Sequence, residues 1–202
     1  MRGRIHCPQG NFFHELGRPA PVYRDVPMKE PLKQFVPSTV CLECDGCCRF
    51  KESDSDWRPH ISPEEIAAVG ASGLAAEIFS KHPFSAEGRV QTAGCGAGGE
   101  HLCAFFNPAD STCRIYGQRP FDCELYPFVL VRKANKTMVC VHLNCPHIQQ
   151  TIGTPEYKQY VKYLQGFFQR PETLESLRKN PALAGDYPAY LRELKELFVL
   201  SI

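Results

Sequence analysis

The sequence has no excess of either charge and no long hydrophobic run. Its 202 residues include 23 Lys and Arg against 22 Asp and Glu, which leaves a net charge of +1. Proteins that bind nucleic acid usually carry a basic patch, so we expect no nucleic-acid partner. The longest aliphatic run, Val129–Val131, is too short to span a membrane, and residues 1–17 contain no apolar stretch of signal-peptide length. We therefore expect a cytoplasmic protein without a membrane contact.

Catalytic fingerprints are also missing. The sequence contains no P-loop, no GxSxG nucleophile elbow and no HExxH zinc motif. The glycine-rich segment 94–99 (GCGAGG) lacks the βα context of a dinucleotide-binding fingerprint and a following Lys-Ser/Thr, so it predicts a flexible loop. Any enzymatic activity would therefore depend on a bound metal or cofactor, and the sequence leaves the question of an enzyme open.

The chain divides into three parts by composition. Residues 1–40 carry six prolines and predict an extended arm, to which we assign no chemistry. Residues 41–148 hold ten of the eleven cysteines and predict a metal-binding domain. Residues 149–202 hold no cysteine and predict helices that pack on that domain. The expected fold class is α+β, with a small irregular cysteine-rich region of short β-hairpins and helices, followed by a C-terminal helical segment.

Local patterns predict the individual elements. A capping box at Ser62–Glu65 predicts a helix to about residue 69, and an apolar face over 74–79 predicts a second helix that ends near 82. Two hairpins are expected, over 102–106 with 113–116 and over 128–133 with 137–143. The apolar spacing in the tail predicts helices over 154–168, 171–179 and about 190–198.

Cysteine is the abundant exception, with 11 residues in 202. An odd total cannot pair fully, and disulfides do not persist in a reducing cytosol, so we expect metal ligation rather than disulfides. The run Cys41-x2-Cys44-x2-Cys47 lets one tight loop surround a single inorganic centre. The next side chain, Cys48, should diverge from Cys47. This pair therefore indicates either two centres or one centre with Cys48 in a supporting role.

The remaining candidate ligands are spread along the chain. They are Cys103, Cys113, Cys123 and Cys145. Arg119 lies between two of them, and its guanidinium could donate hydrogen bonds to thiolate sulfur; a plain salt bridge to Asp122 is an equal alternative. Acidic and phenolic side chains near the thiols could serve in proton transfer or be purely structural: Tyr116, Asp122, Glu124 and Tyr126.

These motifs together resemble a known family. Cys41-x2-Cys44-x2-Cys47-Cys48, the element Ile115-Tyr116-x2-Arg119-Pro120-x2-Cys123 and the later Cys145-Pro146 are similar to the CxxCxxCC family, the YkgJ-type cysteine-cluster proteins described as a zinc- or iron-chelating domain. The resemblance covers about residues 41–148 and implies a metal centre. Cys7, Cys95 and Cys140 lie outside its pattern.

Iron–sulfur and zinc both suit an all-thiolate set. Structural zinc usually takes two separated C-x2-C knuckles, whereas three thiols at x2 spacing plus a remote Cys-Pro resemble a bacterial ferredoxin, so the sequence favours a [4Fe-4S]-type cluster with zinc as the alternative. Histidines are possible substitute ligands: His60, His82, His101, His142 and His147. Two functions remain open. The first is a redox or electron-transfer protein, which includes an oxidoreductase, with an unidentified redox partner. The second is a zinc-stabilised interaction module without catalysis.

Overall fold

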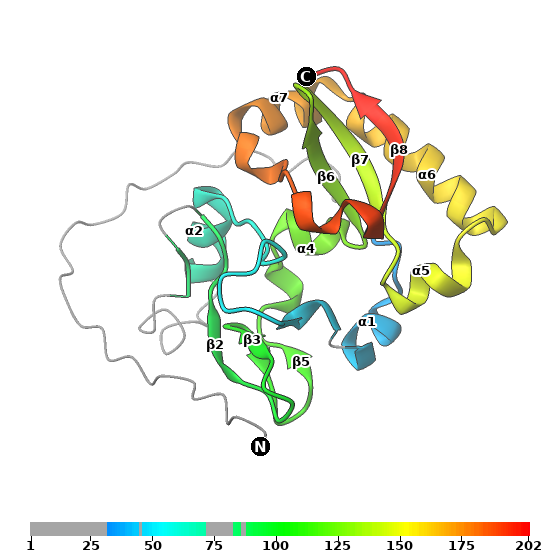
Figure 1. Cartoon of the computed structure of the whole chain (residues 1–202). Helices are drawn as coiled ribbons and strands as arrows, with labels where there is room; N and C mark the ends of the chain where they lie inside the picture. Colours follow the sequence, from blue (N-terminus) through cyan, green and yellow to red (C-terminus); the bar gives the residue numbers. More distant parts are fainter. Residues whose placement is uncertain (1–31, 45, 72–82, 86–87) are drawn as a thin grey trace.

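The computed structural model describes residues 32–44, 46–71, 83–85 and 88–202 and has an α+β fold. Its largest sheet has the order β6-β7-β8, and two smaller antiparallel sheets contain the remaining strands. Figure 1 shows the large sheet with α6 and α7 in the upper part of the molecule and the short strands in the lower part. The predicted fold class is therefore confirmed.

The large sheet begins with the second predicted hairpin. β6 (Phe128–Lys133) pairs antiparallel with β7 (Lys136–His142), and the two turn residues, Ala134 and Asn135, both have positive φ. Positive φ at both positions gives a turn whose twist matches that of the strands. β8 (Leu194–Leu200) pairs antiparallel with the other edge of β7, with a bulge near Cys140.

The helix predicted over 190–198 is wrong. Its first residues lie in the 3₁₀ helix η4 (Pro188–Glu193), and the rest form β8. The segment LKELFVL fits either period, and β7 offers it a free row of backbone donors and acceptors. Tertiary pairing therefore decides a pattern that is ambiguous in the sequence.

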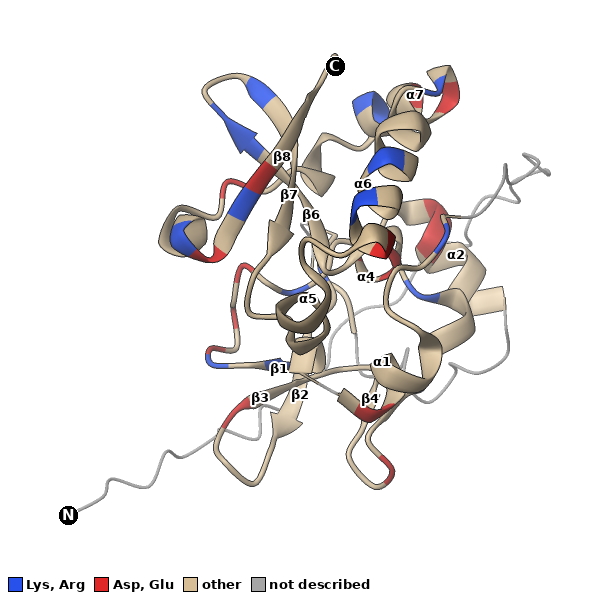
Figure 2. Cartoon of the chain, turned by 90° about the vertical axis from the view of Figure 1, so that its right-hand side faces the viewer, with Lys and Arg blue, Asp and Glu red and all other residues tan. Residues whose placement is uncertain are grey.

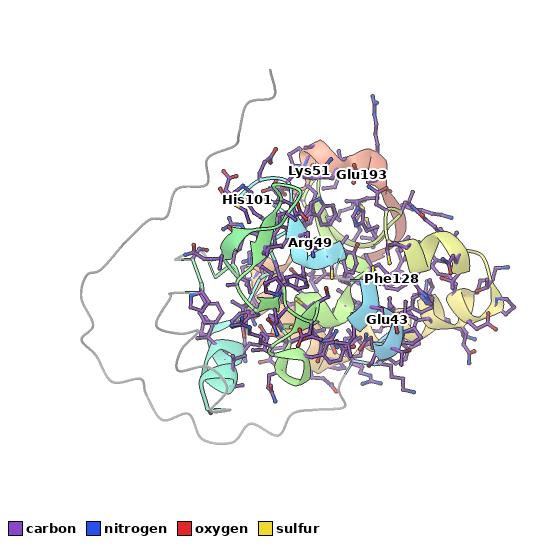
Figure 3. The ribbon with its side chains drawn as sticks, turned by 90° about the horizontal axis from the view of Figure 1, so that it is seen from below. Glu43, Arg49, Lys51, His101, Phe128 and Glu193 are labelled. Atoms are coloured by element: carbon purple, nitrogen blue, oxygen red, sulfur yellow. The ribbon has the colours of Figure 1, made fainter. Side chains whose placement is uncertain are left out.

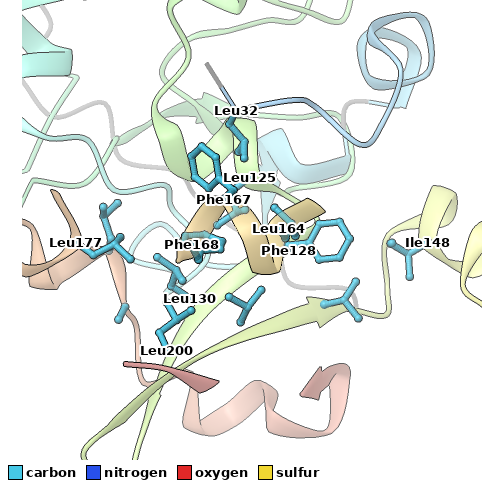
Figure 4. Close-up of a cluster of buried hydrophobic side chains, with 14 of the residues drawn as sticks. Leu32, Leu125, Phe128, Leu130, Ile148, Leu164, Phe167, Phe168, Leu177 and Leu200 are labelled. Atoms are coloured by element: carbon cyan, nitrogen blue, oxygen red, sulfur yellow. The ribbon is translucent and has the colours of Figure 1, made fainter. Parts of the chain in front are cut away.

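Both faces of the large sheet are covered. On one face, Leu130, Val139 and Val141 pack against Leu164 and Phe168 (Figure 4). Those partners come from α6 (Pro155–Phe168), which lies with α7 (Pro171–Lys179) on this side (Figure 2). The Thr154 hydroxyl caps α6 by accepting a hydrogen bond from the Tyr157 N–H at 3.2 Å. Both helices are confirmed where the tail pattern predicts them.

The opposite face of the sheet holds an aromatic cluster. Val129, Val131, Met138 and Cys140 are buried there with Tyr187, and Trp57 packs against this group. Side chains alternate along β7, since Val139 and Val141 face the helices while Cys140 faces the aromatic side. This face connects the sheet to the cysteine-bearing part of the chain, because Trp57 belongs to that part.

The cysteine-bearing part consists of short elements. They are α1 (Ser38–Cys44), η1 (Gly46–Cys48), β1 (Arg49–Phe50), α2 (Pro63–Ala71), β2 (Thr92–Cys95), β3 (His101–Cys103), β4 (Phe106–Asn107), β5 (Thr112–Cys113), η2 (Tyr116–Gln118) and α4 (Phe121–Leu125). The sheets have the orders β1-β3-β2 and β4-β5. Around them lies a small separate core that includes Phe50, Val90, Phe105 and Ile115. Figure 3 shows this part from below, with Arg49 and His101 labelled on its strands.

Several local predictions meet this part of the structure. The capping box before α2 is confirmed: the Ser62 N–H donates to the Glu65 carboxylate at 2.7 Å, and the Glu65 N–H donates to the Ser62 hydroxyl at 3.2 Å. The first predicted hairpin is realised only where β4 pairs with β5, at Phe106 and Cys113, because Leu102 and Cys103 belong to β3, which pairs with β1 and β2. The glycine-rich segment begins in β2 instead of being a loop throughout, and the chain turns after it into β3.

Other predictions fall partly outside the described residues. The whole of the predicted helix over 74–82 and most of the proline-rich arm lie there. From the arm, Leu32 and Val36 are described and are buried; Leu32 belongs to the core beneath the large sheet. Two short segments complete the fold, α5 (Pro146–Thr151) and η3 (Pro181–Leu183). In the described ranges, no helix has the length and apolar character needed to cross a membrane.

Candidate metal centre

Eight cysteines from six separate elements or turns affect one another's pKa through Cys47, and we call them the converging thiols. Two lie on α1, two on η1, one at the end of β3, one at the end of β5, one on α4, and one at the N-cap of α5: Cys41, Cys44, Cys47, Cys48, Cys103, Cys113, Cys123 and Cys145. All eight are free thiols. Cys145 is the member from the sheet side, because the strand β7 leads directly to it.

Cys47 lies at the centre of this group. Its pKa is raised well above the ordinary value, first by a hydrogen bond with the Cys48 side chain and then by desolvation, with further contributions from the charges of Cys48 and Cys44. Cys47 in turn raises the pKa of the more distant thiols at Cys41, Cys103, Cys113, Cys123 and Cys145, in each case together with desolvation as the largest cause. Cys47 therefore interacts with each of the other seven.

The other interactions form two overlapping groups around Cys47, which are joined because Cys113 also interacts with Cys41. Cys145 interacts with Cys44 as well as Cys47. On the other side, Cys103, Cys113 and Cys123 interact with one another, and burial raises the pKa of Cys103 to about 12. We call Cys41, Cys44, Cys47 and Cys145 the sheet-side group and Cys103, Cys113 and Cys123 the hairpin-side group.

Arg119 lies against the sheet-side group. Its Nη1 donates to the Cys41 sulfur at 3.8 Å, and its positive charge lowers the pKa of Cys41 against the larger effect of desolvation. The alternative partner, Asp122, instead accepts a hydrogen bond from the His60 N–H at 2.9 Å. Burial raises the pKa of Asp122 to about 6. The sequence allows Arg119 either a hydrogen bond to sulfur or a salt bridge to Asp122, and the structure agrees with the contact to sulfur.

Two side chains hold the Arg119 guanidinium in place. It stacks on the Tyr116 ring, 3.7 Å from the centroid, while its Nε donates to the Tyr116 carbonyl oxygen. Its Nη2 donates to the Gln34 amide oxygen at 2.9 Å. Sequence reasoning missed Gln34, which lies in the arm to which no chemistry was assigned. No local motif marks a glutamine 85 residues away from its partner.

A second missed feature is a hydrogen-bonded chain beside the sheet-side group. The Tyr126 hydroxyl lies 3.0 Å from Nδ1 of His142, and Nε2 of His142 lies 3.2 Å from the Glu193 carboxylate. The pKa of Tyr126 is raised, first by desolvation and then by Cys47, Cys145, Cys44 and Cys41. The thiols named here are the four of the sheet-side group.

The histidines have varied environments. His60 is buried, and desolvation followed by the nearby Arg89 charge lowers its pKa to about 4. His142 is held in the chain just described, and the ring of His147 packs edge-on against Phe35. His101 lies on β3, and His82 is outside the described residues.

The cysteines that fall outside the family pattern also stand apart in space where they are described. Cys140 is buried in β7 on the aromatic side of the sheet, and its pKa is raised by desolvation and by Glu196 rather than by another thiol. Cys95 is disulfide-bonded, which is an exception to the expectation of metal ligation rather than disulfides. Cys7 lies outside the described residues.

The chemistry of the donor set fits a thiophilic metal. Clustered thiols that raise one another's pKa are the arrangement that a bound cation relieves, because it replaces the protons and offsets the sulfur charges. Within the described ranges, no three Cys, His, Asp or Glu side chains form a group that could hold a metal ion as they stand. The relation among the eight thiols therefore lies in their electrostatic effects on one another and not in a formed ligand set.

Comparison with known proteins gives one match. The model of the CxxCxxCC family, described as "Putative zinc- or iron-chelating domain", matches residues 40–150, more than half of the chain. This range contains the eight converging cysteines and Arg119. No curated protein and no solved structure matches the chain.

Proposed function

Because this chain belongs to the CxxCxxCC family, described as a zinc- or iron-chelating domain, we propose that it holds an iron–sulfur centre and acts as a cytoplasmic redox or electron-transfer protein. The single observation that carries the proposal is that eight free thiols from six elements or turns lie within the matched range, and the electrostatic effect of Cys47 on the others supports it. Thiolates are the ligands that iron–sulfur clusters take in proteins.

The sheet-side group is the proposed ligand set of a [4Fe-4S]-type cluster. Three of its members have the x2 spacing of a ferredoxin run, and the fourth, Cys145, precedes a proline as the remote ferredoxin ligand does. The interaction of Cys145 with Cys44 and Cys47 supports this assignment. When bound, the cluster would supply one-electron chemistry.

The hairpin-side group, with Cys48, is left for a second centre or for support of the first. Desolvation is the largest cause of the raised pKa of Cys103, Cys113 and Cys123, which suits a centre that stabilises the fold. The vicinal pair Cys47–Cys48 stands between the two groups and would connect them.

Arg119 is the proposed positioning residue for the sheet-side cluster. Its guanidinium donates to the Cys41 sulfur and would offset part of the negative charge that four thiolates concentrate. Because Tyr116 and Gln34 hold it in place, it stays there without rearrangement when the cluster binds.

The test is anaerobic purification of the full chain followed by analysis of iron, acid-labile sulfide and zinc. The proposal expects a brown protein with broad visible absorption and with iron and sulfide in similar amounts. Colourless protein with stoichiometric zinc and no sulfide would overturn the iron–sulfur and redox proposal, and would favour a zinc-stabilised interaction module bound to the same thiols.

Serine variants identify the thiols that matter. Cys44→Ser and Cys145→Ser should lower the metal content, whereas Cys140→Ser is the matched control, since this buried thiol lies on the other side of the sheet. Equal metal loss from Cys140→Ser would contradict the proposed ligand set.

A further inference from the structure

The short helix that carries Cys123 cannot cap its own N-terminus. α4 has five residues, and its N-cap residue, Pro120, has no side-chain group that could accept a hydrogen bond from the first turn. The Pro120 carbonyl oxygen accepts from the N–H groups of Cys123 and Glu124. The N–H of Phe121, the first residue of the helix, therefore needs a partner from another part of the chain.

Glu65 of α2 supplies that partner. Its Oε1 accepts from the Phe121 N–H at 2.6 Å, and its Oε2 accepts from the Ser62 N–H at 2.7 Å. One carboxylate therefore caps its own helix and also the helix that carries Cys123. Because both partners are N–H donors, both oxygens must accept, and a carboxylate can do this whereas an amide has only one acceptor atom.

A second carboxylate makes the reverse contact, from α4 to the segment before α2. Oδ2 of Asp122 accepts from the His60 N–H at 2.9 Å. Arg89 binds the same segment, since its Nη1 donates to the Arg58 carbonyl oxygen at 2.7 Å. The two carboxylates together hold the first turn of α4 against the chain between Arg58 and Glu65.

Apolar side chains anchor α4 on the sheet side. The Phe121 ring packs against Phe167 and Phe168 of α6, with ring centroids 6.3 Å and 6.4 Å apart. Leu125 is buried in the same core. The backbone of α4 is thus held by α2 and its apolar side chains by α6, so Cys123, two residues after Phe121, has a fixed place between two anchored positions.

We propose that Glu65 is a positioning residue for Cys123. By holding the first turn of α4, its carboxylate fixes the place of the Cys123 sulfur relative to Cys103 and Cys113. The inference rests on the proposed metal ligation by the hairpin-side group. Groups that orient metal ligands matter nearly as much as the ligands, and their loss typically lowers metal affinity about 10- to 100-fold. Glu65 exerts this effect through the backbone of α4.

The test loads the full chain with Co²⁺ under anaerobic conditions, titrates it with a chelator and follows the absorption of the Co²⁺–thiolate bonds. Cys123→Ser identifies the part of this absorption that depends on Cys123. In Glu65→Gln the side chain keeps its shape, but its NH₂ group must face one of the two N–H donors. The Co²⁺ affinity of the Cys123-dependent part should therefore fall about 10- to 100-fold.

Two control variants separate positioning from stability. Ser62→Ala removes the hydroxyl that accepts from the Glu65 N–H at 3.2 Å, so it weakens the cap of α2 but leaves the Glu65 carboxylate on the Phe121 N–H. It should lower the urea midpoint and leave the Co²⁺ affinity and absorption at their wild-type values. Glu64→Gln, at the exposed neighbouring position of α2, should change neither quantity.

The double variant Glu65→Gln/Cys123→Ser shows whether the effect passes through Cys123. If it does, the double variant should bind Co²⁺ no more weakly than Cys123→Ser alone. Losses that multiply in the double variant, or an equal loss of Co²⁺ affinity in Ser62→Ala, would overturn the positioning role and leave Glu65 as a structural cap.

Each remaining failure contradicts a different claim. Wild-type absorption and affinity in Glu65→Gln overturn the positioning role and leave metal binding standing. Wild-type absorption in Cys123→Ser removes Cys123 from the ligand set, and the positioning role with it. A wild-type chain that shows no Co²⁺–thiolate absorption overturns the proposed function itself.

Discussion

The sheet region (β6 to β8 with α5 to α7) and the cysteine region (α1 to α4) are built in different ways. Strands of the sheet region have six or seven residues and are covered on both faces, whereas strands of the cysteine region have two to four. Short strands supply few backbone hydrogen bonds and little buried area. Seven of the eight converging thiols lie in the region with less structure of its own, which indicates that metal ligation contributes there what packing contributes in the sheet.

Removing the metal should give the largest difference in hydrogen-exchange protection between the two regions. Structural metal sites of this kind supply on the order of 10 kcal/mol to folding, so chelation should abolish hydrogen-exchange protection in β1 to β5. The amides of β6 and β7 should remain protected, because Phe128, Leu130 and Val139 pack on α6 in a core that includes only one of the converging thiols, Cys145. Exchange measured by mass spectrometry with and without chelator tests this; equal loss of protection in both regions would show that they fold as one unit.

Truncating a buried side chain in the core of the sheet region should destabilise that region, whereas metal removal affects the cysteine region. Phe128 is fully buried on β6, with its ring 6.2 Å from that of Tyr157. Phe128→Ala should lower the free energy of unfolding by about 3–5 kcal/mol in urea titrations. Val199→Ala on β8, where the side chain is 54% exposed, is the control and should change it by less than about 0.5 kcal/mol. The comparison would fail if Phe128→Ala released the metal from protein that is still folded.

The same contrast explains how far the sequence predicts the structure. The hairpin β6–β7 and the helices α6 and α7 follow from local periodicity and capping, since their apolar faces repeat over several turns or residues. β8 does not, because its strand pattern is ambiguous until β7 provides a partner. For that reason, the prediction of helices throughout residues 149–202 is wrong at β8.

The candidate site divides similarly. Spacing within 41–48 indicates a metal loop, because nearby thiols must meet whatever the rest of the chain does. The hydrogen-bonded chain beside the thiols could not be predicted from spacing, because Tyr126 and His142 are 16 residues apart and Glu193 follows 51 residues later. Only the β7–β8 pairing brings Glu193 to His142, and that pairing is the element the sequence pattern missed.

Lowering the pH should have a smaller effect, a loss of stability that arises from His60 in the cysteine region. His60 is 7% exposed, and desolvation, aided by Arg89 and Arg58, lowers its pKa to about 4 from 6.5. As the pH falls below about 6.5, the unfolded chain takes up a proton that folded His60 does not, so the folded state loses stability until about pH 4.

His60→Gln tests this effect. Urea titrations at pH 7 and near pH 4.5 should show a smaller acid loss in the variant than in wild type, by up to about 2 kcal/mol. Because both proteins carry the same thiols, loss of metal in acid affects both and drops out of the difference. Identical acid sensitivity in the two proteins would mean that His60 takes up its proton without unfolding.

The smallest expected effect lies in the sheet region, at two tyrosines on one helix. Tyr157 is 6% exposed, and among the described residues its buried hydroxyl has no hydrogen-bond partner, whereas the Tyr160 hydroxyl donates to the Lys33 carbonyl oxygen. An unsatisfied buried hydroxyl is destabilising, so Tyr157→Phe should raise the free energy of unfolding by about 1 kcal/mol, and Tyr160→Phe should lower it by a similar amount. Urea titration of both variants measures the difference. Similar losses in the two would mean that the Tyr157 hydroxyl has a partner after all, and that this core is less purely apolar than its packing indicates.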